Sequence, residues 1–143
     1  MLLGTYEGRL DAQARLVIPL RLRGVVEGGM FLSVGIDACI EVYPREEWER
    51  HVAAEIRGLS RYRKDARTMR RLTLARAFEG RLDKQGRVVV PEILRNYAGI
   101  TDNVVIAGQD AFFEVWSPER WVEQLARESS LSDIAETLGK SNA

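Results

Sequence analysis

The stretch "GRLDAQARLVIPLRLR" occupies residues 8–23, and "GRLDKQGRVVVPEILR" occupies residues 80–95. Ten of the sixteen aligned positions are identical, at a constant offset of 72 residues. Residues 30–52 and 103–125 repeat in the same way at an offset of 73. The chain of 143 residues is therefore two copies of a unit of about fifty residues. Because so small a unit buries little apolar surface, we expect both copies to pack into one body with pseudo-two-fold symmetry.

The repeat and the composition between its copies divide the chain into four parts. They are a first unit (1–60), a linker helix (61–76), a second unit (77–128) and a polar tail (129–143) with one short helix. The linker carries seven basic residues and one acid, and Met69, Leu72 and Ala75 recur in it at helical spacing. We therefore predict a linker helix laid against the body, with arginines on its other faces.

Composition restricts the class of protein. An apolar share of 45% supports a hydrophobic core. The sequence shows neither a signal peptide nor an apolar run long enough to span a membrane, which favours a cytoplasmic, soluble protein. The 21 basic and 21 acidic residues exclude a uniformly basic nucleic-acid binder. Of the basic residues 18 are arginine, which suits phosphate and guanine contacts but equally fits a genome-wide codon bias. The single cysteine, Cys39, is predicted to be a small buried hydrophobe.

Each copy predicts the same series of elements. In the second copy, strands 78–83 and 87–90 would form a β-hairpin whose three-residue loop needs a positive φ at Gly86. A helix over 92–97 follows Pro91 and ends at Gly99. The remaining predicted elements of this copy are a hairpin of strands 103–107 and 112–116, and a helix with Ser117 as N-cap. The first copy repeats the plan with strands 5–11 and 15–18, helix 20–24, strands 30–35 and 39–43, and helix 45–58.

Catalytic chemistry finds little support in the sequence. His51 is the only histidine, so neither a zinc site nor a nucleophile–base pair can be completed with Cys39 alone. The Gly-rich phosphate and dinucleotide motifs do not occur. Asp37 and Asp110 recur symmetrically and are interpreted as turn-capping residues. The recurring Trp48 and Trp121 are interpreted as core. We therefore expect no enzymatic activity, cofactor, metal or small-molecule substrate.

The pattern Asp-x-x-x-Arg occurs once in each copy, at the tip of each predicted hairpin: Asp11 with Arg15, and Asp83 with Arg87. One interpretation is structural, with aspartate organising the turn and pairing with the arginine. The other is functional, because strand alternation places polar side chains on one face of each tip. These side chains are Arg9, Asp11 and Arg15 in the first copy, and Arg81, Asp83, Lys84 and Arg87 in the second. Two such protrusions suit a two-fold or repeated ligand such as duplex DNA, and the residues alone leave both readings open.

The sequence resembles the MraZ family of bacterial transcriptional regulators over residues 1–128. The segments that carry this resemblance are "LGTYEGRLDAQARLVIP" (3–19), "EVYPREEW" (41–48), "GRLDKQGRVVVPEILRNYAGI" (80–100) and "EVWSPERW" (114–121). The resemblance implies an α+β, mainly β fold, with two tandem AbrB-like swapped-hairpin units forming a double-split β-barrel with flanking helices. It also implies a homo-oligomeric ring in the cytoplasm, associated with the nucleoid.

The resemblance further implies sequence-specific binding of double-stranded DNA at direct repeats upstream of the division and cell-wall gene cluster. Asp11, Arg15, Asp83 and Arg87 match the family motif. By position, Arg9, Arg81 and Lys84 are supporting phosphate contacts. No cofactor, metal, membrane or small-molecule substrate is implied. The alternatives are a scaffold ring that does not bind DNA and, more remotely, an enzyme using the paired acids.

One departure from the family pattern concerns the first tip, which reads Ala12-Gln13-Ala14 where the family usually has Lys and Gly before the arginine. If the loop needs a positive φ at position 14, alanine is strained there by about 1 kcal/mol or more. The alternative is a different turn. In either case the departure counts against DNA contact by the first tip, whereas the second tip keeps Lys84 and Gly86.

Overall fold

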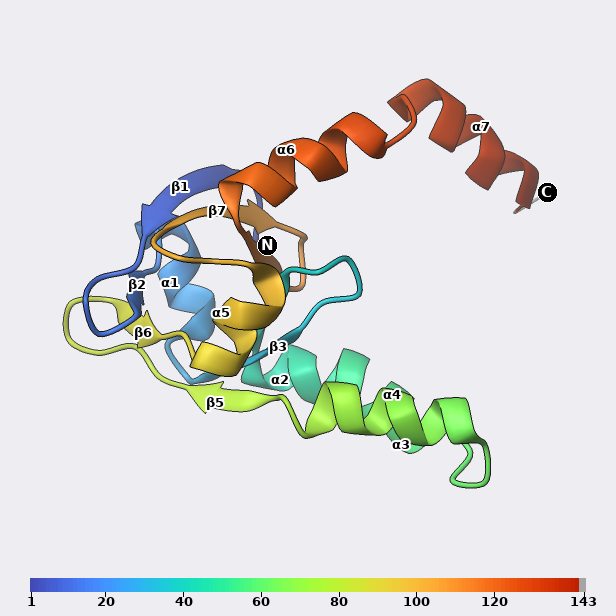
Figure 1. The fold of residues 1–143 in the computed structure, drawn as a ribbon, viewed down its shortest axis with the longest axis horizontal. Coiled ribbons are helices and arrows are strands. Elements are labelled where there is room, and N and C mark those ends of the chain that lie inside the picture. The colour runs from blue at the N-terminus through green and yellow to red at the C-terminus, as the bar shows by residue number, and fades with distance from the viewer. Residues whose placement is uncertain (142–143) are drawn as a thin grey trace.

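A computed structural model of the chain describes residues 1–141. The end of the predicted tail, residues 142–143, lies outside the described residues. The body is built on a six-stranded antiparallel sheet in the order β1-β7-β8-β4-β3-β5 (Figure 1). Its strands are β1 (Thr5–Arg9), β3 (Met30–Val34), β4 (Ile40–Pro44), β5 (Phe78–Gly80), β7 (Asn103–Gly108) and β8 (Phe113–Trp116). The hairpins predicted for 30–35 with 39–43 and for 103–107 with 112–116 are thereby confirmed as β3–β4 and β7–β8.

The other two predicted hairpins are wrong in their strand partners. β2 (Arg15–Val17) and β6 (Arg87–Val89) pair with each other in a separate two-stranded sheet, while β1 pairs with β7 and β5 with β3. Each tip still turns back on itself, because the Asp11 N–H donates to the Arg15 carbonyl over 3.0 Å. A lone two-stranded hairpin is marginal in water, whereas pairing with other strands satisfies more backbone groups and buries both copies together.

Helices join and flank these strands. They are α1 (Leu20–Val26), α2 (Arg45–Glu47), the π-helical turn η1 (Trp48–Ala53), α3 (Ala54–Arg57), α4 (Lys64–Leu74), α5 (Glu92–Ala98), α6 (Pro118–Arg127) and α7 (Leu131–Ser141). The helix predicted over 45–58 therefore has a wide turn at its centre. The Ser117 hydroxyl accepts the Arg120 N–H over 3.1 Å as the predicted N-cap of α6. Gly99, at φ +67°, ends α5 as expected.

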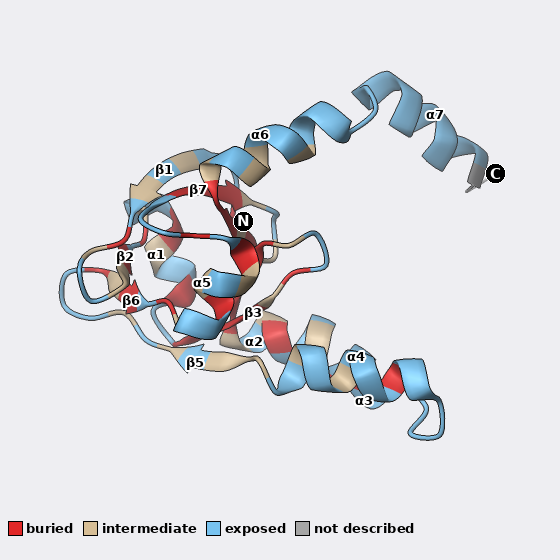
Figure 2. Cartoon of the chain, viewed as in Figure 1, coloured by how far each residue is buried: buried red, intermediate tan, exposed pale blue. Residues whose placement is uncertain are grey.

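One hydrophobic core contains equivalent residues of both copies. Leu16, Ile18 and Leu22 of the first copy and Val88, Val90 and Leu94 of the second are all at most 2% exposed and belong to the same cluster. Figure 2 shows buried residues concentrated in the body, while α4, α6 and α7 are mainly exposed. The prediction that the two copies share a core is confirmed.

The residues interpreted as structural take three kinds of position. Trp48 is buried and stacks on Phe31 with ring centroids 5.2 Å apart, whereas Trp121 is half-buried against Trp116. Cys39 is buried, as predicted. His51 is half-exposed on the helix surface and contacts Glu47 over 2.8 Å.

Candidate nucleic-acid interface

The two tips, defined as residues 11–15 and 83–87, lie side by side at one end of the body (Figure 1). Two backbone hydrogen bonds join them to the opposite copy. The Ile18 N–H donates to the Gly86 carbonyl over 2.9 Å, and the Val90 N–H donates to the Ala14 carbonyl over 2.8 Å. Because the two bonds join equivalent positions of the two copies in opposite directions, the tips are related by the pseudo-two-fold axis of the repeat.

Within each tip, the aspartate organises both the turn and the arginine. One carboxylate oxygen of Asp11 accepts the Gln13 and Arg15 N–H groups, each over 2.9 Å, and the other accepts Arg15 Nε over 2.8 Å. Asp83 makes the equivalent bonds to Gln85 and Arg87 over 2.9, 2.9 and 2.7 Å. The arginine's backbone N–H, followed by its guanidinium, holds the pKa of each aspartate below its usual range. The turn-forming interpretation of both motifs is therefore correct.

Ala14 adopts the same backbone conformation as Gly86, with φ values of +59° and +75°. A different turn at the first tip is therefore excluded, and the left-handed strain predicted for alanine is present. A methyl group on Gly86 would lie 2.5 Å from Nε of Arg23, which covers this position from α1. The two tips therefore share one backbone shape and differ in backbone strain and in side-chain charge.

The arginines are positioned by the turn and remain partly exposed. The side chains of Arg15 and Arg87 are 30% and 24% exposed. Each uses Nε on its own aspartate, and Nη2 of Arg15 also donates to Gln13 over 2.8 Å. Nη1 of Arg87 lies 3.8 Å from Asp11, so the four charged groups form one cluster of alternating sign. A guanidinium has five N–H donors, so this arrangement fixes the plane of each group and leaves donors for a bidentate partner.

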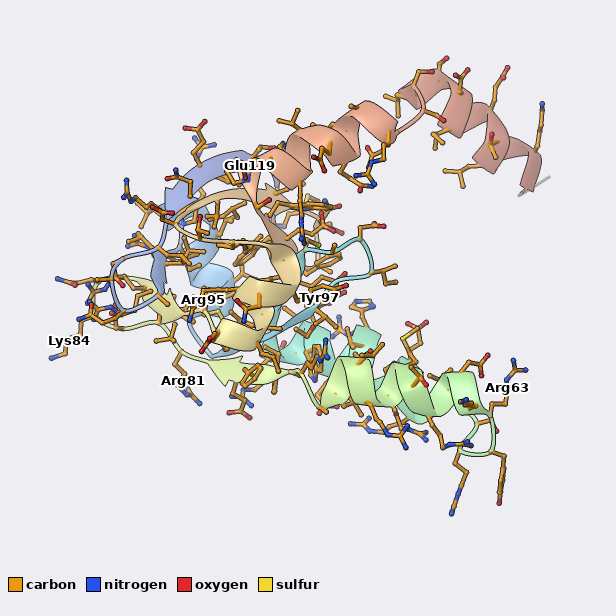
Figure 3. All side chains as sticks on the ribbon, in the orientation of Figure 1. Arg63, Arg81, Lys84, Arg95, Tyr97 and Glu119 are labelled. Carbon is orange, nitrogen blue, oxygen red and sulfur yellow. The ribbon has the colours of Figure 1, made fainter. Side chains whose placement is uncertain are left out.

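The supporting cations lie at different depths. Lys84 projects from the far end of the second tip, and Arg81 lies nearer the body (Figure 3). Arg9, at the end of β1, is 72% exposed and pairs with Asp102 over 3.5 Å. The structure therefore groups Lys84 with the two Asp-x-x-x-Arg motifs and sets Arg9 and Arg81 behind them, at the strand ends that lead into the tips.

Two braces of the tips were missed by the sequence analysis. Nε of Arg23 donates to the Ile18 carbonyl over 2.7 Å, and Nε of Arg95 donates to the Val90 carbonyl over 3.0 Å. Both carbonyls belong to residues whose N–H groups bind the opposite tip. Arg23 and Arg95 are identical positions of the repeat, so the sequence does contain a signal for them.

A second group of titratable residues lies on the sheet. Glu41 and Glu114 face each other across β4 and β8. Glu114 accepts hydrogen bonds from Trp116 Nε1 over 3.0 Å and from Gln109 over 3.1 Å. Burial, followed by the charges of Glu114 and Asp37, raises the pKa of Glu41 to about 7. Burial likewise raises the pKa of the Cys39 thiol.

Two other kinds of site are absent from residues 1–141. No group of three His, Cys, Asp or Glu residues is placed to hold a metal ion within this range. Asp110 contributes to its turn through its backbone, with φ +69° and two hydrogen bonds to Leu2 over 2.8 and 2.9 Å. None of the described helices combines the length and apolar character needed to cross a membrane.

Comparisons with known proteins give one consistent result. The family model described as "MraZ protein, putative antitoxin-like" matches twice, over residues 1–72 and 73–142. A protein of Herpetosiphon aurantiacus named transcriptional regulator MraZ is 42% identical over 140 residues, covering 98% of this chain and 95% of its own. Proteins of the same name from Thermoanaerobacter pseudethanolicus and Roseiflexus castenholzii are 39% and 36% identical, and cover 99% and 98% of both chains.

Proposed function

The chain belongs to the MraZ family, and from this premise we propose that it is a transcriptional regulator that binds double-stranded DNA through its twin tips. The name of the relatives supports the regulatory role. The observation that carries the DNA-binding part is the matched geometry of the tips. Two guanidinium groups are oriented by identical aspartate contacts and related by a two-fold axis.

In the proposed mode, Arg15 and Arg87 read guanine through their Nη groups while their Nε groups stay on the aspartates. A good bidentate pair contributes about 1–3 kcal/mol of discrimination against the wrong base. Lys84, Arg9 and Arg81 would contact phosphates, which fix register and orientation and carry no direct sequence information. The first tip has no residue equivalent to Lys84, so its phosphate contacts would be fewer.

Because the net charge of the chain is zero, a single chain need not bind DNA tightly, and several tips acting together would supply the affinity. We propose a homo-oligomeric ring of double-split barrels with swapped hairpins, which places many tips against direct repeats upstream of the division and cell-wall gene cluster. The cross-copy pairing of β2 with β6 supports the swapped arrangement. Linked sites raise the overall affinity without any new contact. A protein of this kind would act in the cytoplasm at the nucleoid.

The test compares wild type with an Arg15→Lys/Arg87→Lys double variant by fluorescence anisotropy. The duplexes are the upstream repeats of its own gene cluster and a shuffled sequence of equal composition. Lysine keeps the charge but loses the bidentate fork, so we expect the preference for the repeats to fall at least tenfold. Raising the salt concentration should weaken wild-type binding steeply, because phosphate contacts release counterions.

The matched control is Arg50→Ala/Arg57→Ala. It removes two exposed arginines that pair with glutamates on the helix surface, away from the tips. We expect it to keep the wild-type preference. If the tip variant discriminates as well as wild type, the assignment of the tips is wrong. If wild-type protein assembles but shows no preference for the repeats, the alternative of a scaffold ring is favoured instead.

A further inference from the structure

We infer that the exposed face of α4 is an assembly surface and that its occupant is the α6–α7 elbow of a second copy. The elbow is defined here as residues 125–134, where α6 ends and α7 begins. The inference rests on the proposed homo-oligomer and assigns the contact that would build it. It concerns helices at the other end of the molecule from the DNA-reading tips (Figure 1).

The first surface is a shallow hollow on α4. Met69 and Leu72, one helical turn apart, are 45% and 42% exposed. The other residues that line the hollow are Arg63, Lys64, Asp65 and Thr68. The opposite side of α4 is covered, because Arg70 donates to the Leu59 carbonyl over 2.9 Å and to Ile56 over 3.4 Å. The predicted linker helix therefore contacts the body on one side. Met69 also lines a hollow with Val52, Ile56 and Leu59 on that side, so Met69 and Leu72 lie at the edge of the covered face and are only partly exposed.

The second surface is the elbow. Leu125, Leu131 and Ile134 are 50%, 86% and 43% exposed and line a hollow together with Glu128 and Ser129. Residues 131–140 of α7 are all exposed. An isolated helix of eleven residues is marginal in water. An apolar stripe on such a helix indicates that a partner covers it.

The two hollows complement each other in charge. Both have an apolar floor, and the rim of the α4 hollow is mainly cationic, whereas the rim of the elbow carries Glu128. Overall, α4 carries four basic residues and one acid, and α7 carries two acids and one basic residue. Docking would bring Lys64 of one copy towards Glu128 of the next and would cover both apolar floors.

The occupant is a second copy, because the two surfaces project from different parts of the same body. Figure 1 shows α4 below the body and the junction of α6 and α7 above it, both extending away from the tips. A contact between two different surfaces is head-to-tail, and it generates closed rings when its rotation closes. A DNA backbone would suit the arginines of α4, but it leaves Met69 and Leu72 unexplained.

The test uses the full chain, size-exclusion chromatography with light scattering, and two variants. The α4 variant is Met69→Glu/Leu72→Glu, and the elbow variant is Leu131→Glu/Ile134→Glu. Each variant alone lacks one half of the contact, so each should elute at the mass of a single chain. Mixed together, they retain one intact contact and should form a 1:1 dimer that grows no further. Leu20→Glu/Ile93→Glu, at exposed sites on α1 and α5, is the control and should assemble as wild type.

Each outcome tests either the proposed oligomer or the assigned contact. If wild type is a single chain, the proposed oligomer fails. If wild type assembles and either variant assembles equally, the assigned contact is wrong. It is also wrong if both folded variants stay single after mixing, or if the α4 variant assembles normally but binds DNA more weakly. Circular dichroism checks that each variant is folded. If a glutamate variant unfolds, it is replaced by the alanine variant at the same positions, Met69→Ala/Leu72→Ala or Leu131→Ala/Ile134→Ala. The alanine variants should assemble at least tenfold more weakly than wild type.

Discussion

Gly86→Ala is the substitution for which the structure gives the sharpest expectation. Gly86 has φ +75°, a conformation that costs an L-residue about 1–2 kcal/mol. The new methyl group would also lie 2.5 Å from Nε of Arg23, so the guanidinium would shift and its 2.7 Å bond to the Ile18 carbonyl would weaken. The equivalent bond of Arg95, beside Ala14, is longer at 3.0 Å. A hydrogen bond of this charged type contributes about 1.5–3 kcal/mol. Because only part of that contribution is lost, we expect the free energy of unfolding to fall by about 2–3 kcal/mol.

Ala14→Gly provides the matched reverse change in the other copy. Ala14 already carries the backbone strain at φ +59°, so glycine should raise the free energy of unfolding by up to about 1 kcal/mol. The two substitutions are therefore expected to be unequal as well as opposite in sign. Urea unfolding at one fixed protein concentration measures both, because an oligomer's stability depends on concentration.

Arg23→Ala separates the two causes of the Gly86→Ala effect. In the Arg23→Ala background the displaced hydrogen bond no longer exists, so Gly86→Ala should cost only about 1–2 kcal/mol, the backbone strain alone. Equal costs in both backgrounds would refute the clash with Arg23. A loss of stability in Ala14→Gly would refute the reasoning about strain.

Three further expectations follow from buried or hydrogen-bonded groups. Because the pKa of Glu41 is about 7 in the folded chain against 4.5 unfolded, the folded state holds more protons between these values, so stability should fall as pH rises from 4.5 to 7. Glu41→Gln should remove this fall in urea titrations at each pH. Trp48→Ala should cost about 3–5 kcal/mol in urea unfolding by opening the stack on Phe31. Ser117→Ala should cost about 1 kcal/mol in the same unfolding assay, because it removes the N-cap of α6.

Local chemistry made the turns and helix ends predictable. Asp83 and Gly86 specify a tip because a carboxylate binds the N–H groups that follow it and only glycine takes a positive φ freely. Ser117 and Gly99 likewise mark helix ends through their own hydrogen bonds and conformation. These features depend on a few neighbouring residues, so the sequence contains all the information needed to place them.

Strand partners were not predictable in the same way. The alternating exposure of β1 is equally satisfied by β2 or by β7, because alternation says which face is buried and not which strand is adjacent. The pairing of β1 with β7 and of β2 with β6 is determined by the packing of both copies over one core. The exposed stripe of Met69 and Leu72 has the same cause, since helical spacing identifies an apolar face but not what covers it.

The sequence motif identified the residues of the candidate site, but it did not predict the contact between the two tips. The motif located Asp11, Arg15, Asp83 and Arg87, and the structure adds that Arg87 of one copy reaches Asp11 of the other. This contact joins residues 76 positions apart, so no local sequence pattern at either tip predicts it.

Duplication within one chain has a consequence that a true homodimer would not share. In a homodimer both tips carry the same residues, so a substitution alters both at once. Here Ala12 stands where the second tip has Lys84, and Ala14 stands where it has Gly86, although the two turns keep one geometry. The common geometry is enforced because each tip binds the backbone of the opposite copy, so the first tip can lack the lysine without losing its shape. The proposed assembly would therefore present tips with and without the lysine in alternation, and the spacing of the lysine–phosphate contacts on DNA would follow the whole chain and not the half-chain.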